Sequence, residues 1–402
     1  MRNSLSFLRN LFLLFSISTV SVAGVWTQKA NVPGIGRADG TGTAAGGRGY
    51  IGTGYTTGYS TDWYEYNPGT NAWTTKAPFG GAPCVESSCF ALNNCPYVLS
   101  GPTAIDFWKF DPATNTWTQM ATFAGPARQA AVAWAINGLG YITTGAAPTL
   151  GGSSDDLWEY DPTANSWLQK ANLPGVARHY AAGFSIGNIG YVGTGYSAVT
   201  GSNLNDVWAW DQATNTWAPI ANFPGAARNE ATAFSIGNYG FMGGGYSPLP
   251  SGDFYKYDPV SNTWSSIAAF SGGGRVETVS FSIGNSGYLG TGWDGTAFRN
   301  DFWEYHEGDP TGLGDDHQLL AKDKFSLFPN PVHNETVLKL DEAVITDHAI
   351  YQVLNVNGEE ILNGELTGHS TVIQRGNIVP GFYILEVMKD GVRVLRTNFV
   401  VE

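Results

Sequence analysis

The sequence is poor in charge, in cysteine and in histidine. Charged residues make up 14% of the 402 positions, and there are 3 cysteines, 6 histidines and 4 methionines. This composition does not suit a helical bundle, which needs Leu, Glu, Lys and Ala. The formal net charge is −13. An acidic surface repels phosphate backbones, so we expect no nucleic-acid partner and no docking on anionic lipid.

Glycine and aromatic residues are abundant instead. The chain has 52 Gly, 21 Phe, 19 Tyr and 14 Trp. Many short strands joined by tight turns, with large rings between the sheets, would use such a mixture. The length allows two or three ordinary domains, although a closed all-β domain can extend over about 250 residues or more as one unit.

Residues 1–24 have the pattern of a signal peptide. Arg2 and Arg9 supply the positive start, and Leu11 to Val22 is apolar. Ser21-Val22-Ala23 places small residues at −3 and −1 of a cleavage site. The alternative is a membrane anchor, but these apolar residues are fewer than the ~20 that a spanning helix needs. We expect export, cleavage and no membrane span afterwards.

The cysteines are Cys84, Cys89 and Cys95. The repeat pattern below places the first two on one extended strand, where their separation corresponds to ~17 Å. A disulfide needs Cα atoms within ~7 Å. We therefore predict no simple disulfide.

A unit of 44 to 50 residues recurs along the chain. Its last tryptophan appears at Trp26, Trp73, Trp117, Trp167, Trp217 and Trp264. The unit contains a strand such as 178–186, a Gly-Asn turn, a Gly-rich strand, a variable loop, a Trp-x-Tyr strand and an Asp/Asn turn. That period and order predict the four-stranded blades of a β-propeller.

Five of these units are complete, and the sixth is completed from elsewhere in the sequence. The sixth runs from Arg275 to Tyr305 and has no Trp strand of its own. Residues 25–30 supply it, which would close the ring and remove exposed sheet edges. We predict an all-β, six-bladed propeller over 25–308, closed by the N-terminal strand; an open or seven-bladed array is the alternative.

The repeated Gly-Tyr-(Ile/Val)-Gly-Thr-Gly and Trp-Glu-Tyr-Asp-Pro-x-x-Asn-x-Trp resemble the kelch repeat, as in the central propeller of galactose oxidase-like proteins. The usual Gly-Gly pair is mostly Gly-Thr-Gly here. The resemblance implies the fold and says little of function, because propellers host many activities.

The pattern stops after Tyr305. A Gly/Pro/Asp-rich linker covers 309–324, and 325–402 alternates apolar and polar residues as a small Ig-like sandwich would, with strands expected at 337–340, 350–356, 371–373, 382–387 and 392–401. Phe325 to Pro331, Val353 to Gly358 and Pro380 to Leu385 resemble the type A sorting domain of the type IX secretion system. This implies transfer through the periplasm by that machinery, then release or attachment at the outer surface. An ordinary adhesive sandwich is the alternative, and the ending Asn398 to Glu402 departs from the family's basic terminus.

Candidate ligand-binding residues lie where the propeller prediction places one face, together with five loops of varied length. These residues are Arg37, Arg128, Arg178, Arg228, Arg275, Tyr55, Tyr196, Tyr246 and Trp293. Guanidinium groups with aromatic faces suit acidic sugars, carboxylates or acidic peptides. Cys84 replaces the arginine in the second unit. The alternative is structural: an aspartate also recurs once per unit, and the two sets could form ion pairs between blades, at Asp62, Asp106, Asp156, Asp206, Asp253 and Asp301.

These patterns favour a secreted or cell-surface binding protein for carbohydrate or protein, expected to be a monomer without cofactor, metal or catalytic residues. Residues that occur once at this face, His179, Glu86, Glu230 and Glu277, are candidates for specificity. A sialic acid epimerase or mutarotase of the kelch type is the enzymatic alternative, with Glu230 or Glu277 as acid/base. A galactose oxidase-like copper site is less supported, because it needs two His and two Tyr ligands and the propeller region has only His179 and His306.

Overall fold

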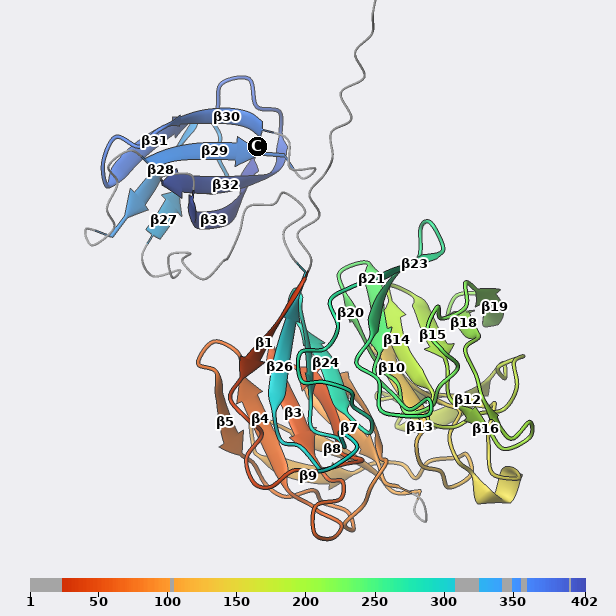
Figure 1. Cartoon of the computed structure of the whole chain (residues 1–402). Coiled ribbons are helices and arrows are strands. Elements are labelled where there is room, and N and C mark those ends of the chain that lie inside the picture. The colour runs from red at the N-terminus through yellow and green to blue at the C-terminus, as the bar shows by residue number, and fades with distance from the viewer. Residues whose placement is uncertain (1–23, 102–104, 308–324, 342–348, 356–359, 390–391) are drawn as a thin grey trace, which may run out of the picture. The chain divides into compact units, whose positions relative to one another are not determined.

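The computed structural model describes residues 24–101, 105–307, 325–341, 349–355, 360–389 and 392–402 (Figure 1). The chain divides into two compact units, one formed by Ala23–Glu307 and the other including Gly308–Glu402. The expected signal peptide, apart from Gly24, and the expected linker lie outside the described residues. In the part of the chain that is described, no helix has the length and apolar character needed to cross a membrane.

The first unit is all-β, and its described residues form six four-stranded antiparallel sheets. In order from the innermost strand outward, the first three are β2 (Thr41–Ala45), β3 (Arg48–Gly52), β4 (Trp63–Asn67) and β5 (Ala72–Thr75); β6 (Ser88–Leu92), β7 (Cys95–Leu99), β8 (Phe107–Asp111) and β9 (Thr116–Gln119); and β10 (Val132–Ile136), β11 (Leu139–Thr143), β12 (Leu157–Asp161) and β13 (Ser166–Lys170).

The other three sheets follow the same order. They are β14 (Ala182–Ile186), β15 (Ile189–Gly193), β18 (Val207–Asp211) and β19 (Thr216–Ile220); β20 (Thr232–Ile236), β21 (Tyr239–Gly243), β22 (Phe254–Asp258) and β23 (Thr263–Ser266); and β24 (Val279–Ile283), β25 (Ser286–Gly290), β26 (Phe302–His306) and β1 (Val25–Lys29). A short ribbon, β16 (Tyr196–Ser197) with β17 (Ser202–Asn203), and one 3₁₀ turn, Pro148–Leu150, lie in the connecting loops.

The sheets are arranged around a common axis. Each innermost strand contacts the innermost strand of the next sheet, in the cycle β2, β6, β10, β14, β20, β24 and back to β2. The strands therefore surround an axial channel, as in a β-propeller.

The N-terminal strand joins the last sheet, as the sequence predicts. Trp26 of β1 lies opposite Tyr305 of β26. Its indole Nε1 donates to the carbonyl of Ala268 at 3.1 Å, just as Trp73 donates to Ala30 at 2.8 Å in the first sheet. The last sheet is thus formed by strands from both ends of the unit, β1 and β24 to β26.

Aromatic rings fill the space between neighbouring sheets. Phe184 on β14 lies against Gly240 on β21 of the following sheet, where a Cβ atom would stand 2.1 Å from the ring. Phe90 on β6 meets Gly140 on β11 in the same way, at 2.2 Å. The glycine of the second strand is therefore needed because a ring from the adjacent sheet occupies the place of its side chain, in addition to the general crowding expected near the axis.

The innermost strands begin later than expected. The predicted strand from Arg178 begins only at Ala182, because Tyr180 has a positive φ of 53° that interrupts the extended backbone. The same correction moves Cys84 out of β6, which begins at Ser88. All three cysteines are free thiols.

The second unit contains two sheets around one core. The strands are β27 (Phe325–Phe328), β28 (Glu335–Leu340) and β31 (Ser370–Gln374) in one sheet, and β30 (Glu360–Glu365), β29 (Ala349–Leu354), β32 (Gly381–Lys389) and β33 (Val392–Val401) in the other. Leu338, Val353 and Leu385 from both sheets are fully buried together. The sequence prediction omitted β27 and β30; β30 has no buried residue on either face and so no apolar alternation to detect.

Candidate functional site

The five arginines proposed as ligand-binding residues are in the protein interior. Their side chains are at most 3% exposed. Arg178 donates from both terminal nitrogens to the two carboxylate oxygens of Asp206 at 2.7 Å, and from Nη1 to the carbonyl of Thr194 at 3.2 Å. Equivalent pairs join Arg37 to Asp62, Arg128 to Asp156, Arg228 to Asp253 and Arg275 to Asp301. These guanidinium groups have no open surface to offer a ligand.

The pairs are formed inside each sheet, which corrects the expected pairing between blades. Arg178 precedes β14 and Asp206 precedes β18 of the same sheet, so the side chains tie the innermost strand to the third. The arginine backbone makes the link between sheets, because its N–H donates to Ser154 at 3.0 Å and its carbonyl accepts from Gly145 at 2.9 Å. Arg37, Arg228 and Arg275 make the equivalent backbone contacts. These four arginines thus hold their own sheets together and fix the preceding sheet beside them.

In four of the pairs the arginine lowers the pKa of its aspartate, at Asp62, Asp156, Asp206 and Asp253. Burial opposes the charge of Asp156, but the hydrogen bonds and positive charge of Arg128 outweigh burial and lower the pKa of the carboxyl. In the second sheet Cys84 occupies the arginine position and is buried, with its Sγ 3.0 Å from the Ser87 hydroxyl. Asp106 of that sheet accepts instead from Gln119 at 3.4 Å.

A different set of residues surrounds the mouth of the axial channel. They stand two positions after each arginine or its equivalent, and all have a positive φ between 51° and 56°: Asp39, Glu86, Ala130, Tyr180, Glu230 and Glu277. For non-glycine residues this left-handed conformation is uncommon and is frequent at functional sites. We call these six residues the axial ring.

Backbone hydrogen bonds connect the axial ring from sheet to sheet. Glu86 N–H donates to Asp39 at 2.9 Å, Ala130 to Glu86 at 3.0 Å, Tyr180 to Ala130 at 3.1 Å and Glu230 to Tyr180 at 2.9 Å. The six side chains line a cavity of about 160 Å³. These hydrogen bonds fix the backbone of the ring from Asp39 to Glu230.

The carboxyl groups of the axial ring resist ionisation. Burial, together with the charges of Glu277 and Glu86, raises the pKa of Asp39 to about 8. Burial and the neighbouring acids raise the pKa of Glu230 to about 7 and that of Glu277 to about 7. Burial also raises the pKa of Glu86, although the Tyr180 hydroxyl donates to its Oε1 at 2.7 Å and partly offsets this. Near neutral pH the ring therefore holds both protonated and ionised carboxyls.

The four aromatic candidates form an outer layer at the same mouth. Tyr55 exchanges backbone hydrogen bonds with Ala38, and Tyr196, Tyr246 and Trp293 do the same with the residue preceding their own ring position, namely His179, Asn229 and Val276. Tyr55 and Tyr246 are each 39% exposed. The Tyr55 ring also packs edge-on against Tyr59 and Phe298, at 6.0 and 5.9 Å between centroids. Aromatic side chains thus lie next to the polar cavity that the axial ring lines.

His179 lies between the two layers. Its Nδ1 is 2.9 Å from the hydroxyl of Ser153, and its ring packs against Tyr180 and Tyr196 at 5.2 and 5.4 Å. Burial lowers its pKa, so it is neutral near pH 7. In this state the imidazole can donate or accept a hydrogen bond at the rim.

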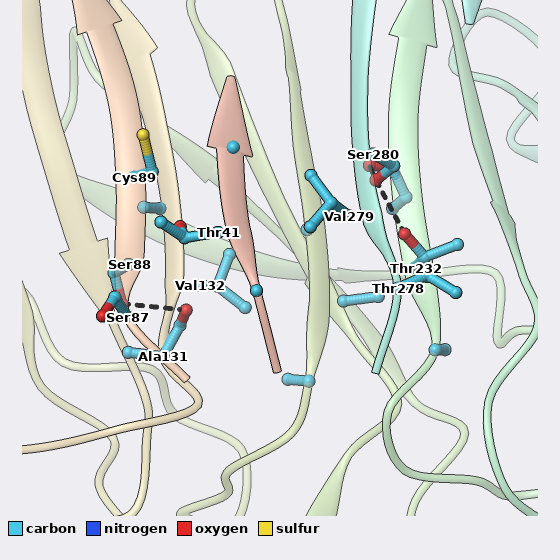
Figure 2. Close-up of a pocket in the computed structure, with 18 residues that line it drawn as sticks. Thr41, Ser87, Ser88, Cys89, Ala131, Val132, Thr232, Thr278, Val279 and Ser280 are labelled. Carbon is cyan, nitrogen blue, oxygen red and sulfur yellow. Dashed lines mark hydrogen bonds between the residues drawn. The ribbon is translucent and has the colours of Figure 1, made fainter. Parts of the chain in front are cut away.

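Below the axial ring the channel is lined by small side chains. Figure 2 shows Thr41, Cys89, Val132 and Val279 among the residues that line this part of the channel. Ser88 donates to the Ala131 carbonyl at 3.2 Å and Thr232 donates to Ser280 at 2.7 Å. These hydroxyls are satisfied within the protein. Within the described residues, no three His, Cys, Asp or Glu side chains are grouped so as to hold a metal ion.

Sequence reasoning found part of this site. It named Glu86, Glu230 and Glu277 as unique residues at this face, and it missed Asp39. The signal was available: the residue two positions after the arginine position varies from unit to unit, while the arginine recurs in five of the six. The sequence left open whether the recurring arginines contact a ligand or pair with the recurring aspartates, and it did not show that the variable residues two positions later face the axis.

Comparisons with known proteins found similarity to a protein family and to solved structures. Residues 326–402 match the secretion system C-terminal sorting domain, a signal for type IX secretion that directs proteins to the cell surface or to secretion. Among solved structures, that of YjhT is similar, with a TM-score of 0.59 and 19% identity over 68% of this chain and 96% of that chain. At this identity the similarity shows the fold alone. No curated protein matches the chain.

Proposed function

We propose that this chain is a secreted or surface-attached carbohydrate-binding protein, built on a six-bladed kelch-type propeller and exported by its C-terminal domain. The observation that carries the proposal is the mouth of the axial channel. Four carboxyl groups and Tyr180 surround a cavity of about 160 Å³. The exposed Tyr55 and Tyr246 form backbone hydrogen bonds with the residues that precede Asp39 and Glu230. Carboxyl oxygens accept hydrogen bonds from sugar hydroxyls, and aromatic faces pack against the apolar face of a sugar ring.

The charge of the cavity selects among sugars. Arg37, Arg178 and their equivalents do not face it, so nothing positive on the described inner lining offsets the four acids. A carboxylated sugar would meet like charge in a half-buried site, which is unfavourable. Neutral or amino sugars fit better, because an ammonium group would be attracted both to ionised carboxyls and to the tyrosine faces.

The experiment is a glycan array probed with the secreted protein, containing neutral, amino and sialylated glycans in parallel. Glu230→Gln and Glu277→Gln should each weaken retention of the best ligand by at least tenfold. Glu65→Gln is a matched control, because Glu65 bonds Tyr50 at 2.7 Å on the third strand, away from the mouth. Uniform retention by all three variants, or a preference for sialylated glycans, would contradict the proposal. Binding to proteins on a matched array, with no glycan bound, would replace carbohydrate by a protein ligand.

A carbohydrate-active enzyme is the second candidate, and the raised pKa values favour it. Carboxyls with a pKa of about 7, as at Glu230 and Glu277, can exchange protons at neutral pH and so serve as general acid or base. The class of reaction would be epimerisation or mutarotation of a sugar, as in kelch-type sialic acid epimerases or mutarotases. NMR observation of anomer exchange tests it with neutral, amino and sialic sugars. If the wild type accelerates anomer exchange, and Glu230→Gln and Glu277→Gln both reduce it to the uncatalysed rate, the protein is an enzyme.

The rest of the proposed organisation follows the sequence predictions. A signal peptide at the start would take the chain to the periplasm, and the sorting domain, of type A with an Ig-like sandwich, would pass it to the type IX machinery. We propose that the chain acts as a monomer. Removal of 325–402 should leave the propeller inside the periplasm, as fractionation and immunoblotting would show.

A further inference from the structure

An asparagine in the outer turn of each complete repeat accepts hydrogen bonds. In the third sheet, Asn165 Oδ1 accepts from the Tyr160 hydroxyl at 2.8 Å and from the backbone N–H of Ala121 in the preceding repeat at 2.9 Å. Asn71, Asn215 and Asn262 bond a third-strand aromatic residue in the same way, at 2.9 to 3.2 Å. The asparagine stands two residues before the outer-strand tryptophan.

The sixth sheet has no such asparagine in its described residues. Its outer strand is β1, and the residue two positions before Trp26 is Gly24. A glycine has no side chain to accept a hydrogen bond. The equivalent third-strand residue is Tyr305, which is fully buried and whose hydroxyl has no hydrogen-bond partner among the described residues. A buried hydroxyl without a partner costs about 1–3 kcal/mol.

Gly24 lies directly against that hydroxyl. It is buried, and a Cβ on it would stand 2.2 Å from the Tyr305 oxygen. The Gly24 nitrogen and such a Cβ are each ~1.5 Å from the same Cα, so the nitrogen lies within about 5 Å of this oxygen. The antiparallel ladder ends at Val25, which is opposite His306, and Gly24 and Glu307 are the residues next to this last pair. Burial raises the pKa of the Tyr305 hydroxyl, and the negative charge of Glu307 raises it further, so the Glu307 carboxylate lies close to that hydroxyl.

We propose that signal peptidase cleaves between Ala23 and Gly24, and that the new α-ammonium group of Gly24 is bound by Tyr305 and Glu307. Hydrolysis adds water across the peptide bond, leaves a carboxylate on Ala23 and gives Gly24 an amine that is protonated at neutral pH. The ammonium donates one hydrogen bond to the Tyr305 hydroxyl oxygen and pairs with the Glu307 carboxylate, whose Oε1 also accepts from Lys256. Processing therefore completes the one sheet junction that lacks its asparagine, and it secures the strand that closes the ring.

This assignment explains two features of the sequence together. A small residue at −1, Ala23, suits the peptidase. A glycine at +1 is needed because any side chain would collide with Tyr305, whose ring is held by Trp26 at 5.0 Å and Phe241 at 5.5 Å. We expect the mature protein to begin at Gly24.

The test compares two forms of the full-length mature chain, one beginning at Gly24 and one retaining Ala23 as an extra residue. We expect the Gly24 form to melt about 2–4 °C higher. Tyr305→Phe should lower the Tm of the Gly24 form but raise that of the Ala23 form, where it removes a buried hydroxyl that has no partner. Tyr160→Phe is the matched control, because its hydroxyl has an asparagine partner and its loss should affect both forms equally.

Two further measurements separate this binding from a merely structural role of Tyr305. The pKa of the ¹⁵N-labelled Gly24 amine should lie above its ordinary ~7.7–8.0 and return to that range in Glu307→Gln. Intact mass of the protein secreted by its host should correspond to a chain starting at Gly24. A different mature N-terminus, or equal Tm values for the two forms together with an ordinary amine pKa, would overturn the proposal.

Discussion

The buried Arg128–Asp156 pair offers the sharpest test of the assignment of the arginines to architecture. Replacing Asp156 by alanine leaves the Arg128 guanidinium, 0% exposed, without its counter-ion. Removing one partner of a buried ion pair costs about 3–5 kcal/mol. Large domains lose roughly 2 °C of Tm for each kcal/mol, so Tm should fall by roughly 6–10 °C.

The repeats provide their own graded controls. The partner aspartate is 8% exposed in Asp156, 19% in Asp301 and 35% in Asp253. Where the aspartate is more exposed, water can replace it more readily at the guanidinium, so the cost of its removal should decrease in that order. Asp156→Ala, Asp301→Ala and Asp253→Ala therefore test how exposure of the aspartate changes the cost of its removal, in one type of ion pair within one protein.

The assay is urea unfolding followed by tryptophan fluorescence, with glycan retention measured on the same samples. Asp156→Ala should lower the unfolding midpoint most, and each variant that remains folded should keep its ligand. The reasoning is refuted if Asp156→Ala is neutral, if Asp253→Ala is the most damaging, or if Arg178→Ala abolishes ligand binding while the midpoint stays unchanged. The last result would indicate that the arginines bind the ligand.

Further predictions follow from other contacts. Because burial raises the pKa values of Glu230 and Glu277 from 4.5 to about 7, their contribution to stability is fully present below pH 4.5 and is lost by about pH 7; the urea midpoint of the unliganded protein should therefore fall between about pH 4.5 and pH 7, and the double Gln variant should reduce the fall. Affinity for an amino sugar should change in the opposite sense, rising by calorimetry as the pH passes through about 7, because ionised carboxyls attract the ammonium; a pH-independent affinity would place the ligand elsewhere. Gly240→Ala puts a methyl group into the ring of Phe184 and should cost about 1–3 kcal/mol in urea unfolding, whereas Gly187→Ala, in an open turn, should not meet that ring. Asn165→Ala removes the acceptor for two donors and should cost about 1–3 kcal/mol by the same measurement; a neutral effect would show that water replaces the amide.

The backbone conformation of Tyr180 shows which kind of structural feature the local sequence does not determine. The Tyr180 position reads as part of a strand because apolar residues alternate around it, yet its backbone is left-handed in the fold. Hydrogen bonds to Ala130 and Glu230 in the flanking sheets accompany that conformation. Each of these partners belongs to a different repeat from Tyr180, so no local window of sequence contains them.

The repeated sequence by itself determined the unit of structure. The spacing of its tryptophans, its turn residues and its alternating strands are local features, and each unit needs neighbours on which to bury its rings, so the number of units and the role of Trp26 in the last sheet could be predicted. The sorting domain was predictable for the same reason, from short motifs in order. The tertiary structure decided the rest. Folding of a single sheet paired Arg178 with Asp206. Closure of the ring brought Asp39, Glu86, Glu230 and Glu277 together from four different repeats, and brought Gly24 against Tyr305. Electrostatics and burial depend on distances in space, and those distances exist only once the sheets surround a common axis.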